Sequence, residues 1–133
     1  MIYAMFIVSM LTIAVGLIAV RARMICVKRG ELSFSYFKLM QGQEVPEVIT
    51  KTTRCFNNLF EIPTLFYIVC TLYITLGIES NIAIVLAWLF TIFRCAQAYI
   101  HLGYNFARHR IFAFGGSVLC VFVLWINLLV QIS

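Results

Sequence analysis

Four stretches of apolar residues, each close to twenty residues long, constrain the fold of this chain more than any other feature. They cover residues 1–20, 55–78, 82–102 and 111–132. An α-helix needs about 20 residues to cross the roughly 30 Å hydrocarbon core of a bilayer. The pattern therefore predicts an all-α membrane protein: a single domain over residues 1–133 in which four transmembrane helices form a bundle.

The composition agrees with a protein embedded in a membrane. Of the 133 residues, 63% are hydrophobic and 11% are charged, whereas soluble domains average about 45–50% apolar and about 25% charged residues. Four crossings leave almost no residues for a separate soluble domain. The five cysteines show no paired spacing and His101 has no second histidine at ligand spacing, so we expect neither a disulfide framework nor a metal site.

The net charge of +5 is concentrated in two of the three connections between the apolar stretches. The basic residues in and beside these connections are Arg21, Arg23, Lys28, Arg29, Lys38, Lys51, Arg54, Arg108 and Arg110. Both connections lie on the same side of a four-span protein. The positive-inside rule places that side in the cytoplasm and places both termini outside or in the lumen. Because the membrane accounts for the charge, we expect lipids and not nucleic acid as the partner.

The first connection, residues 21–53, is about thirty residues long, a length typical of functional or mobile loops. Its aromatic middle, residues 33–40, fits a short helix at the membrane interface and a plain surface loop equally well. Pro46 marks an expected break, after which the second helix resumes near Thr50.

Polar residues recur on one face of the second apolar stretch. Arg54, Asn58 and Glu61 are spaced i, i+4 and i+7, so they share a helix face. Glu61 lies about 10 Å deeper than Arg54, and Pro63 predicts a kink beside it. A charge at membrane depth costs about 2.5–3.5 kcal/mol, so such a residue normally faces a polar interior or serves function.

The third stretch carries a second polar stripe. Gln97, His101, Tyr104 and Arg108 follow the spacing i, i+4, i+7 and i+11, and Arg94 lies one turn deeper. All of these residues belong to the half of the protein assigned to the cytoplasmic side. We therefore predict a polar cleft that opens to the cytoplasm and is closed by apolar residues above.

A purely structural pairing of Glu61 with Arg94 is the simpler alternative, and it leaves the other polar residues on these faces unexplained. Arginines can hold carboxylates bidentately. Neutral hydrogen bonds can come from Asn58, Gln97 and Tyr104, and Glu61 can take an amine. This set suits a small, multiply charged, peptide-like molecule beside a lipid-soluble second substrate. Since one four-helix unit has little interior, we expect a homo-oligomer that shields these groups.

These residues resemble the MAPEG family, the membrane-associated proteins in eicosanoid and glutathione metabolism. Arg54-x-x-x-Asn58-x-x-Glu61, with Pro63 soon after, is similar to the second-helix signature of the family. Arg94 and the later Arg108-His109-Arg110 are similar to its third-helix pattern. The resemblance extends over the whole chain through its length, its four spans and its long first connection.

The resemblance implies homotrimers with glutathione bound between neighbouring subunits near the cytoplasmic face. It further implies that Arg54, Asn58 and Glu61 bind glutathione, that Arg94 supports Glu61 and that Arg21 reaches the carboxylates of glutathione. Gln97, His101 and Tyr104 complete the expected binding set. The thiol-activating arginine of the family corresponds to Arg110 or, second, to Arg108, because the spacing from Arg94 fits both.

The implied activity is glutathione transfer to a hydrophobic electrophile, or reduction of a lipid hydroperoxide. Gln97 and His101 stand where the eicosanoid-forming members carry tyrosines, and Ile62 replaces a tyrosine after Glu61. These departures resemble bacterial or divergent members and argue against leukotriene or prostaglandin synthesis.

Two other functions compete with this hypothesis. A non-catalytic membrane scaffold of the same fold would keep the predicted Glu61–Arg94 pair without turnover. A small multidrug transporter would also have four spans, but such transporters rely on a glutamate in the first helix. The first stretch here carries no ionisable side chain other than tyrosine before Arg21, which argues against transport.

Overall fold

The computed structural model describes residues 1–39 and 44–133. It consists of helices α1 (Ile2–Lys28), α2 (Tyr36–Leu39), α3 (Glu47–Thr75), α4 (Asn81–Leu102) and α5 (Ala107–Ile132). Four of these helices are long and apolar enough to cross a membrane, and α2 is a single turn. The predicted all-helical fold, with four helices able to span a membrane, is confirmed.

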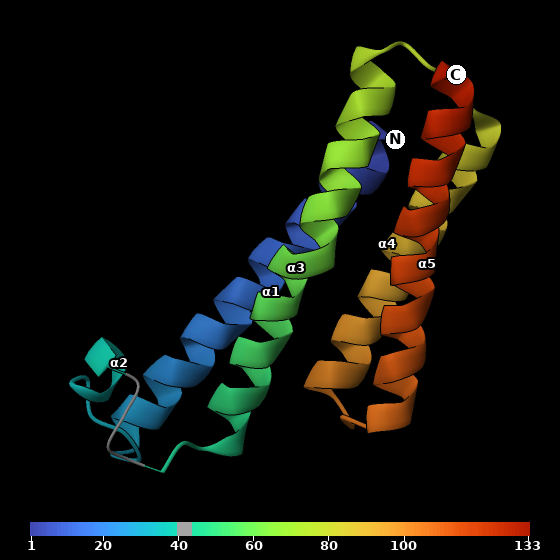
Figure 1. Cartoon of the computed structure of the whole chain (residues 1–133). Coiled ribbons are helices and arrows are strands. Elements are labelled where there is room, and N and C mark those ends of the chain that lie inside the picture. Colours follow the sequence, from blue (N-terminus) through green and yellow to red (C-terminus); the bar gives the residue numbers. More distant parts are fainter. Residues whose placement is uncertain (40–43) are drawn as a thin grey trace.

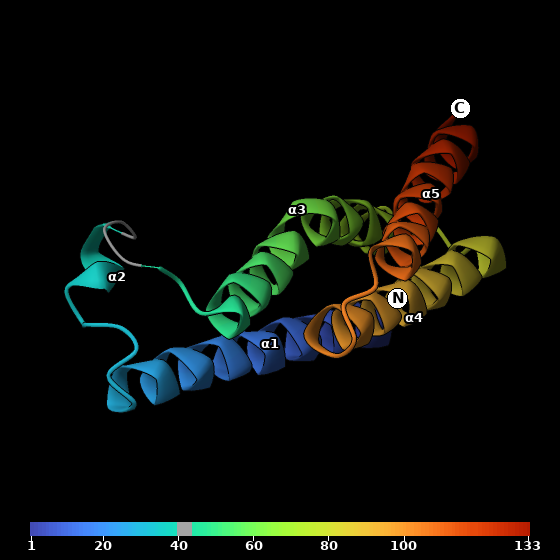
Figure 2. The same ribbon diagram turned by 90° about the horizontal axis from the view of Figure 1, so that it is seen from below.

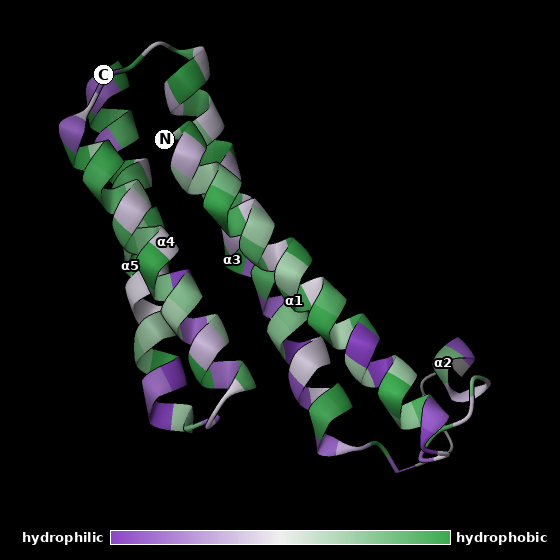
Figure 3. Cartoon of the chain, turned by 180° about the vertical axis from the view of Figure 1, so that it is seen from behind, coloured by the Kyte–Doolittle hydropathy of each residue, from purple (hydrophilic) through white to green (hydrophobic). Residues whose placement is uncertain are grey.

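The long helices form two antiparallel pairs, α1 with α3 and α4 with α5 (Figure 1). Both termini and the α3–α4 turn lie at one end of the bundle, which we call the distal end. The α2 segment and the α4–α5 connection lie at the other end, which we call the basic end. The two pairs approach each other at the distal end and diverge toward the basic end (Figures 1 and 2). Coloured by hydropathy, the helices are largely apolar, and polar segments gather toward the basic end (Figure 3).

The main core fills the distal half of the bundle. Phe66 of α3 stacks on Phe90 of α4 with ring centroids 4.1 Å apart, and Val8 and Leu124 close the cluster from α1 and α5. Burial of such side chains contributes roughly 1.5–3 kcal/mol each in water, but within a bilayer close packing carries the association of helices. This core fixes where α3 and α4 meet.

Polar groups at the distal end are paired with one another. The Tyr73 hydroxyl donates to Asn127 Oδ1 at 2.7 Å and also contacts the Leu124 carbonyl at 3.2 Å. Ser80 Oγ donates to the same Asn127 oxygen at 3.2 Å and accepts from the Ala83 amide, which caps the start of α4. This network joins α3, α4 and α5 at the end of the bundle.

The helices extend further than the apolar stretches. Helix α1 continues to Lys28, and α3 begins at Glu47 rather than near Thr50. The predicted 21–53 loop is therefore partly helical, and the connection itself runs from Arg29 to Pro46. The physical reason is a small cluster at the basic end in which Cys26, Leu32, Tyr36 and Ile49 bury one another. Within the expected 33–40 piece, α2 supplies one helical turn, and residues 40–43 lie outside the described residues.

Pro63 lies inside α3, which remains one continuous helix. Its side chain is buried, and α3 bends along its length (Figure 2). A proline removes one helical hydrogen bond and crowds the preceding turn, which favours such a bend. The bend separates the part of α3 in the core from the part that carries Asn58 and Glu61.

Candidate functional site

Arg94 is the most deeply placed charge of the bundle, with an exposed fraction of 0%. Its Nη1 donates to Gln97 Oε1 at 2.7 Å and makes a longer contact of 3.5 Å with the Asn58 carbonyl. Its guanidinium carbon lies 5.4 and 5.5 Å from the ring centroids of Phe90 and Phe114, which provides cation–π stabilisation. Arg94 Nε and Nη2 have no hydrogen-bond partner among residues 1–39 and 44–133. Buried donors are normally hydrogen-bonded, so these two N–H groups make Arg94 a candidate binding residue.

His101 follows Gln97 by one helical turn and is also buried, with an exposed fraction of 1%. Its Nδ1 has no partner in the described part of the chain. Together with Arg94, Gln97, Asn58 and Cys55, it lines a cavity of about 10 Å³, which is close to the space that one water molecule occupies. The structure thus brings together four of the predicted residues around one small polar space.

A larger cavity of about 320 Å³ adjoins this space between α3, α4 and α5. It is lined by the polar residues Asn58, Gln97 and Arg110 and by the apolar residues Ala107, Ile111 and Phe114. Asn58 and Gln97 line both cavities, so the two are neighbours. A volume of this order lies within the roughly 300–1,000 Å³ range of small-molecule sites.

The structure distinguishes the two candidate arginines at the start of α5. Arg110 is half-buried, lines the larger cavity and donates from Nη1 to Asn105 Oδ1 at 2.9 Å. Its buried Nε has no partner among the described residues. Arg108 is exposed and makes no hydrogen bond or ion pair within that same set. The geometry therefore places Arg110, and not Arg108, at the cavity.

Arg21, Arg54 and Glu61 do not line this cavity and are exposed on the single chain. Within the described part of the chain, the one ion pair joins Arg29 and Glu31, 4.0 Å apart. The direct Glu61–Arg94 pair expected from the sequence is thus not formed within the single chain. The reason is the rotation of α3 about its axis, which exposes the face that carries Arg54 and Glu61. Arg94 donates a hydrogen bond to Gln97 instead.

The predicted stripe on the third span is wrong beyond His101. Helix α4 ends at Leu102 with Gly103 at its C-cap, so Tyr104 and Arg108 do not continue the face of Gln97. Tyr104 is 58% exposed, and its hydroxyl lies 2.9 Å from His109 Nδ1. Glycine after a helix is a common termination signal, and Gly103 could have revealed this end.

Two residues that the sequence did not single out shape the basic end. Lys51, on the first turns of α3, donates from Nζ to the Gly103 carbonyl at 2.8 Å. Asn105 adopts a positive φ of 51° and holds Arg110. Asparagine in a short interhelical connection is a known signal for this backbone conformation.

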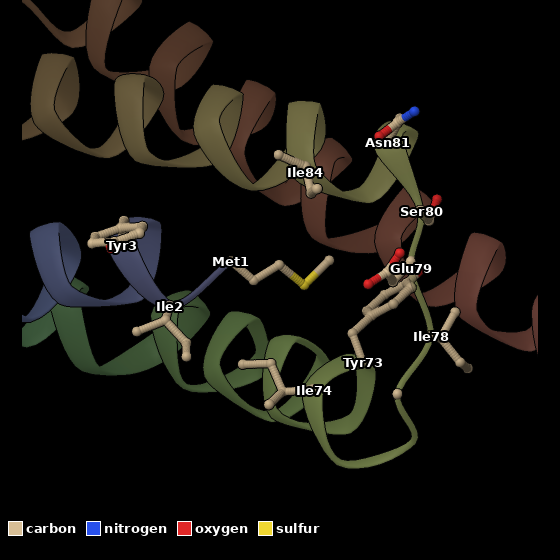
Figure 4. A pocket seen from close by; sticks show the side chains of 11 residues that line it. Met1, Ile2, Tyr3, Tyr73, Ile74, Ile78, Glu79, Ser80, Asn81 and Ile84 are labelled. Atoms are coloured by element: carbon tan, nitrogen blue, oxygen red, sulfur yellow. The ribbon is translucent and has the colours of Figure 1, made fainter.

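A further cavity of about 670 Å³ lies at the distal end and contains none of the predicted residues. The Met1 side chain extends toward it from α1, and Tyr73 and Glu79 lie on the opposite side (Figure 4). Its lining combines isoleucines of α1, α3 and α4 with the polar residues Glu79, Ser80 and Asn81. This cavity therefore carries a carboxylate, whereas the cavities at the basic end are lined by arginine and amide side chains.

Comparison with known proteins identifies the family of the chain. A family model described as the MAPEG family matches residues 1–130, nearly the whole chain. A search of curated proteins found no significant match. The match covers α1, α3, α4 and all but the last two residues of α5, together with the residues that line both cavities at the basic end. This chain belongs to the MAPEG family.

Proposed function

We propose that this protein is a membrane enzyme that binds glutathione and activates its thiol as the thiolate, for transfer to a hydrophobic electrophile or for reduction of a lipid hydroperoxide. Membership in the MAPEG family supports a glutathione-related membrane function in general, because its members use glutathione. The observation that carries the proposal is the convergence of Arg110, Asn58 and Gln97 on one cavity, with buried Arg94 directly behind it.

The donor set fits the chemistry of glutathione, which carries two carboxylates, amide groups and a thiol. Arginine binds carboxylates through paired hydrogen bonds, and Arg94 and Arg110 both retain N–H groups without partners among the described residues. Asn58 and Gln97 offer neutral amides to the peptide backbone of the ligand. Apolar Ile111 and Phe114 line the same cavity and would receive the hydrophobic second substrate.

Thiol activation follows from the charge of Arg110. A free thiol has a pKa near 8.5, and an adjacent cation lowers the pKa of such a group by about 1–3 units. The thiol proton leaves to solvent, and the thiolate sulfur forms a bond to the electrophilic carbon while the displaced electron pair goes to the leaving group or takes up a proton. In the peroxidase reaction, two thiols reduce one hydroperoxide to an alcohol and water and become a disulfide.

The outward polar face of α3 supports a homotrimer with the site between subunits. Arg54 and Glu61 are exposed on the single chain, and Glu61 lies in the middle of a helix long and apolar enough to span the membrane. A charge in this position is costly against lipid, and a neighbouring subunit would shield it. Arg54, Glu61 and Arg21 would then meet glutathione held at the cavity of the neighbour, on the cytoplasmic side that the charge distribution favours.

A thiolate difference spectrum in the ultraviolet tests this function. Purified wild-type protein, Arg110→Ala and Arg108→Ala are titrated with glutathione in detergent, with the oligomeric state measured for each. We expect a saturable thiolate band in the wild type and in Arg108→Ala, and its loss in Arg110→Ala with assembly intact. Removal of one positioned donor commonly costs about 10²–10³ in turnover. The proposal fails if no variant binds millimolar glutathione, an outcome that favours a scaffold. Loss of the band in Arg108→Ala alone would transfer the activating role to Arg108.

A further inference from the structure

Arg110 is held by a residue of the connection that precedes α5. Asn105 Oδ1 accepts a hydrogen bond from Arg110 Nη1 at 2.9 Å. The backbone of Asn105 has φ 51°, in the left-handed region that asparagine adopts more readily than most residues. Its own amide donates to the Ile100 carbonyl at 2.8 Å, so the end of α4 fixes the conformation from which the side chain reaches Arg110.

The rest of the connection is anchored on both sides. The Gly103 amide donates to the Tyr99 carbonyl at 2.9 Å, and the Gly103 carbonyl accepts from Lys51 of α3. Tyr104 and His109 contact each other through a hydrogen bond of 2.9 Å. Asn105 therefore lies on a segment that is tied to α3, α4 and α5 before any ligand binds, and this preorganisation is what a positioned arginine needs.

The group that accepts the hydrogen bond from Arg110 is the neutral side-chain amide of Asn105. An amide oxygen accepts a hydrogen bond without cancelling the charge of the donor, whereas a carboxylate would form an ion pair. No carboxylate of the described residues lies within 4 Å of the Arg110 guanidinium. Arg110 is thus oriented while its positive charge stays available, and its buried Nε remains unused.

We propose that Asn105 is the positioning residue of Arg110, and that its neutral amide is required because it orients the guanidinium without neutralising it. This inference rests on the proposed thiol activation. It predicts that exchanging the amide for a carboxylate at position 105 is more harmful than deleting the side chain. A purely structural role for Asn105 predicts the opposite order, because aspartate keeps the acceptor and also tolerates a positive φ.

The test compares Asn105→Asp and Asn105→Gly in the full-length, assembled protein. Both variants accept the left-handed backbone. In Asn105→Asp, the added carboxylate opposes the thiolate, so the pKa of bound glutathione rises by about one unit or more, which means about tenfold less thiolate at a pH below that pKa. In Asn105→Gly, the loosened guanidinium gives a smaller rise in pKa and about two- to fivefold weaker thiolate binding.

The readout is the pH midpoint of the thiolate band, with thermal stability measured alongside. Asn81→Asp places the same substitution at the distal end, and it should leave the midpoint unchanged. A wild-type midpoint in both Asn105 variants overturns the inference and leaves the proposed function standing. A midpoint raised more in Asn105→Gly than in Asn105→Asp also overturns it and makes Asn105 a structural residue. Absence of a thiolate band in the wild type overturns both proposals together.

Discussion

The two ends of the bundle treat their polar side chains in opposite ways. At the distal end, Tyr73, Asn127 and Ser80 form hydrogen bonds with one another. At the basic end, Arg94 and Arg110 are held by a single neutral side chain each and keep N–H groups without partners in the described part of the chain. Buried polar groups that serve stability are normally satisfied. The contrast fits a distal network that stabilises the fold and a basic end that, under the proposed function, binds glutathione.

Replacing Arg94 by methionine should have the largest effect on ligand binding at the basic end. Glutathione affinity should fall about tenfold or more, because a buried donor of ionic hydrogen bonds is lost. Stability should change by less than about 1 kcal/mol, because an apolar side chain of similar volume often replaces a buried charge without loss. Isothermal titration and thermal unfolding measure the two effects, with Arg29→Met as an exposed arginine control. A large drop in stability with unchanged affinity would make Arg94 a structural residue.

Tyr73→Phe should give the reverse result. The variant loses the hydroxyl that contacts Asn127 and Leu124, and the free energy of unfolding should fall by about 1–2 kcal/mol. Glutathione affinity and the thiolate midpoint should remain within about twofold of the wild type. A clear shift of the thiolate midpoint would show that the two ends are coupled and would contradict separate roles for them.

Lys51→Met should have the smallest effect. It removes the exposed hydrogen bond to the Gly103 carbonyl, so the free energy of unfolding should fall by roughly 0.5 kcal/mol. Amide hydrogen exchange should become faster in the connection between α4 and α5, which that bond anchors. Unchanged exchange at residues 103–106 would show that α4 and α5 alone order the segment.

The sequence predicted the four long apolar helices because length and hydropathy directly limit what can cross a bilayer. It also grouped Arg94, Gln97 and His101, because i, i+3 and i+4 spacing determines which residues share a helix face. Rotation of one helix against another cannot be read from spacing, and this is why Glu61 was paired with Arg94. The stripe through Tyr104 failed for a local reason, since one glycine at position 103 ended the helix.

The hydrogen bond between Asn105 and Arg110 could not be predicted from the sequence, for a different reason. The bond from Asn105 depends on a single residue with positive φ in a short connection. Spacing rules for regular helices do not apply across such a residue. The sequence shows an asparagine in the connection, but only the structure shows that its side chain accepts a hydrogen bond from Arg110.

The length of α3 has a consequence for the depth of the site. Its 29 residues extend over about 43 Å, more than the roughly 30 Å of a typical hydrocarbon core. If its distal end lies at one surface of the bilayer, the other surface crosses α3 near Cys55, with Arg54 at the boundary and Glu61 about 10 Å inside. A thicker or thinner bilayer moves this boundary along the helix at modest cost. Bilayer thickness therefore determines the depth below the membrane surface that a water-soluble ligand must reach. A lipid-soluble ligand would enter laterally from the bilayer.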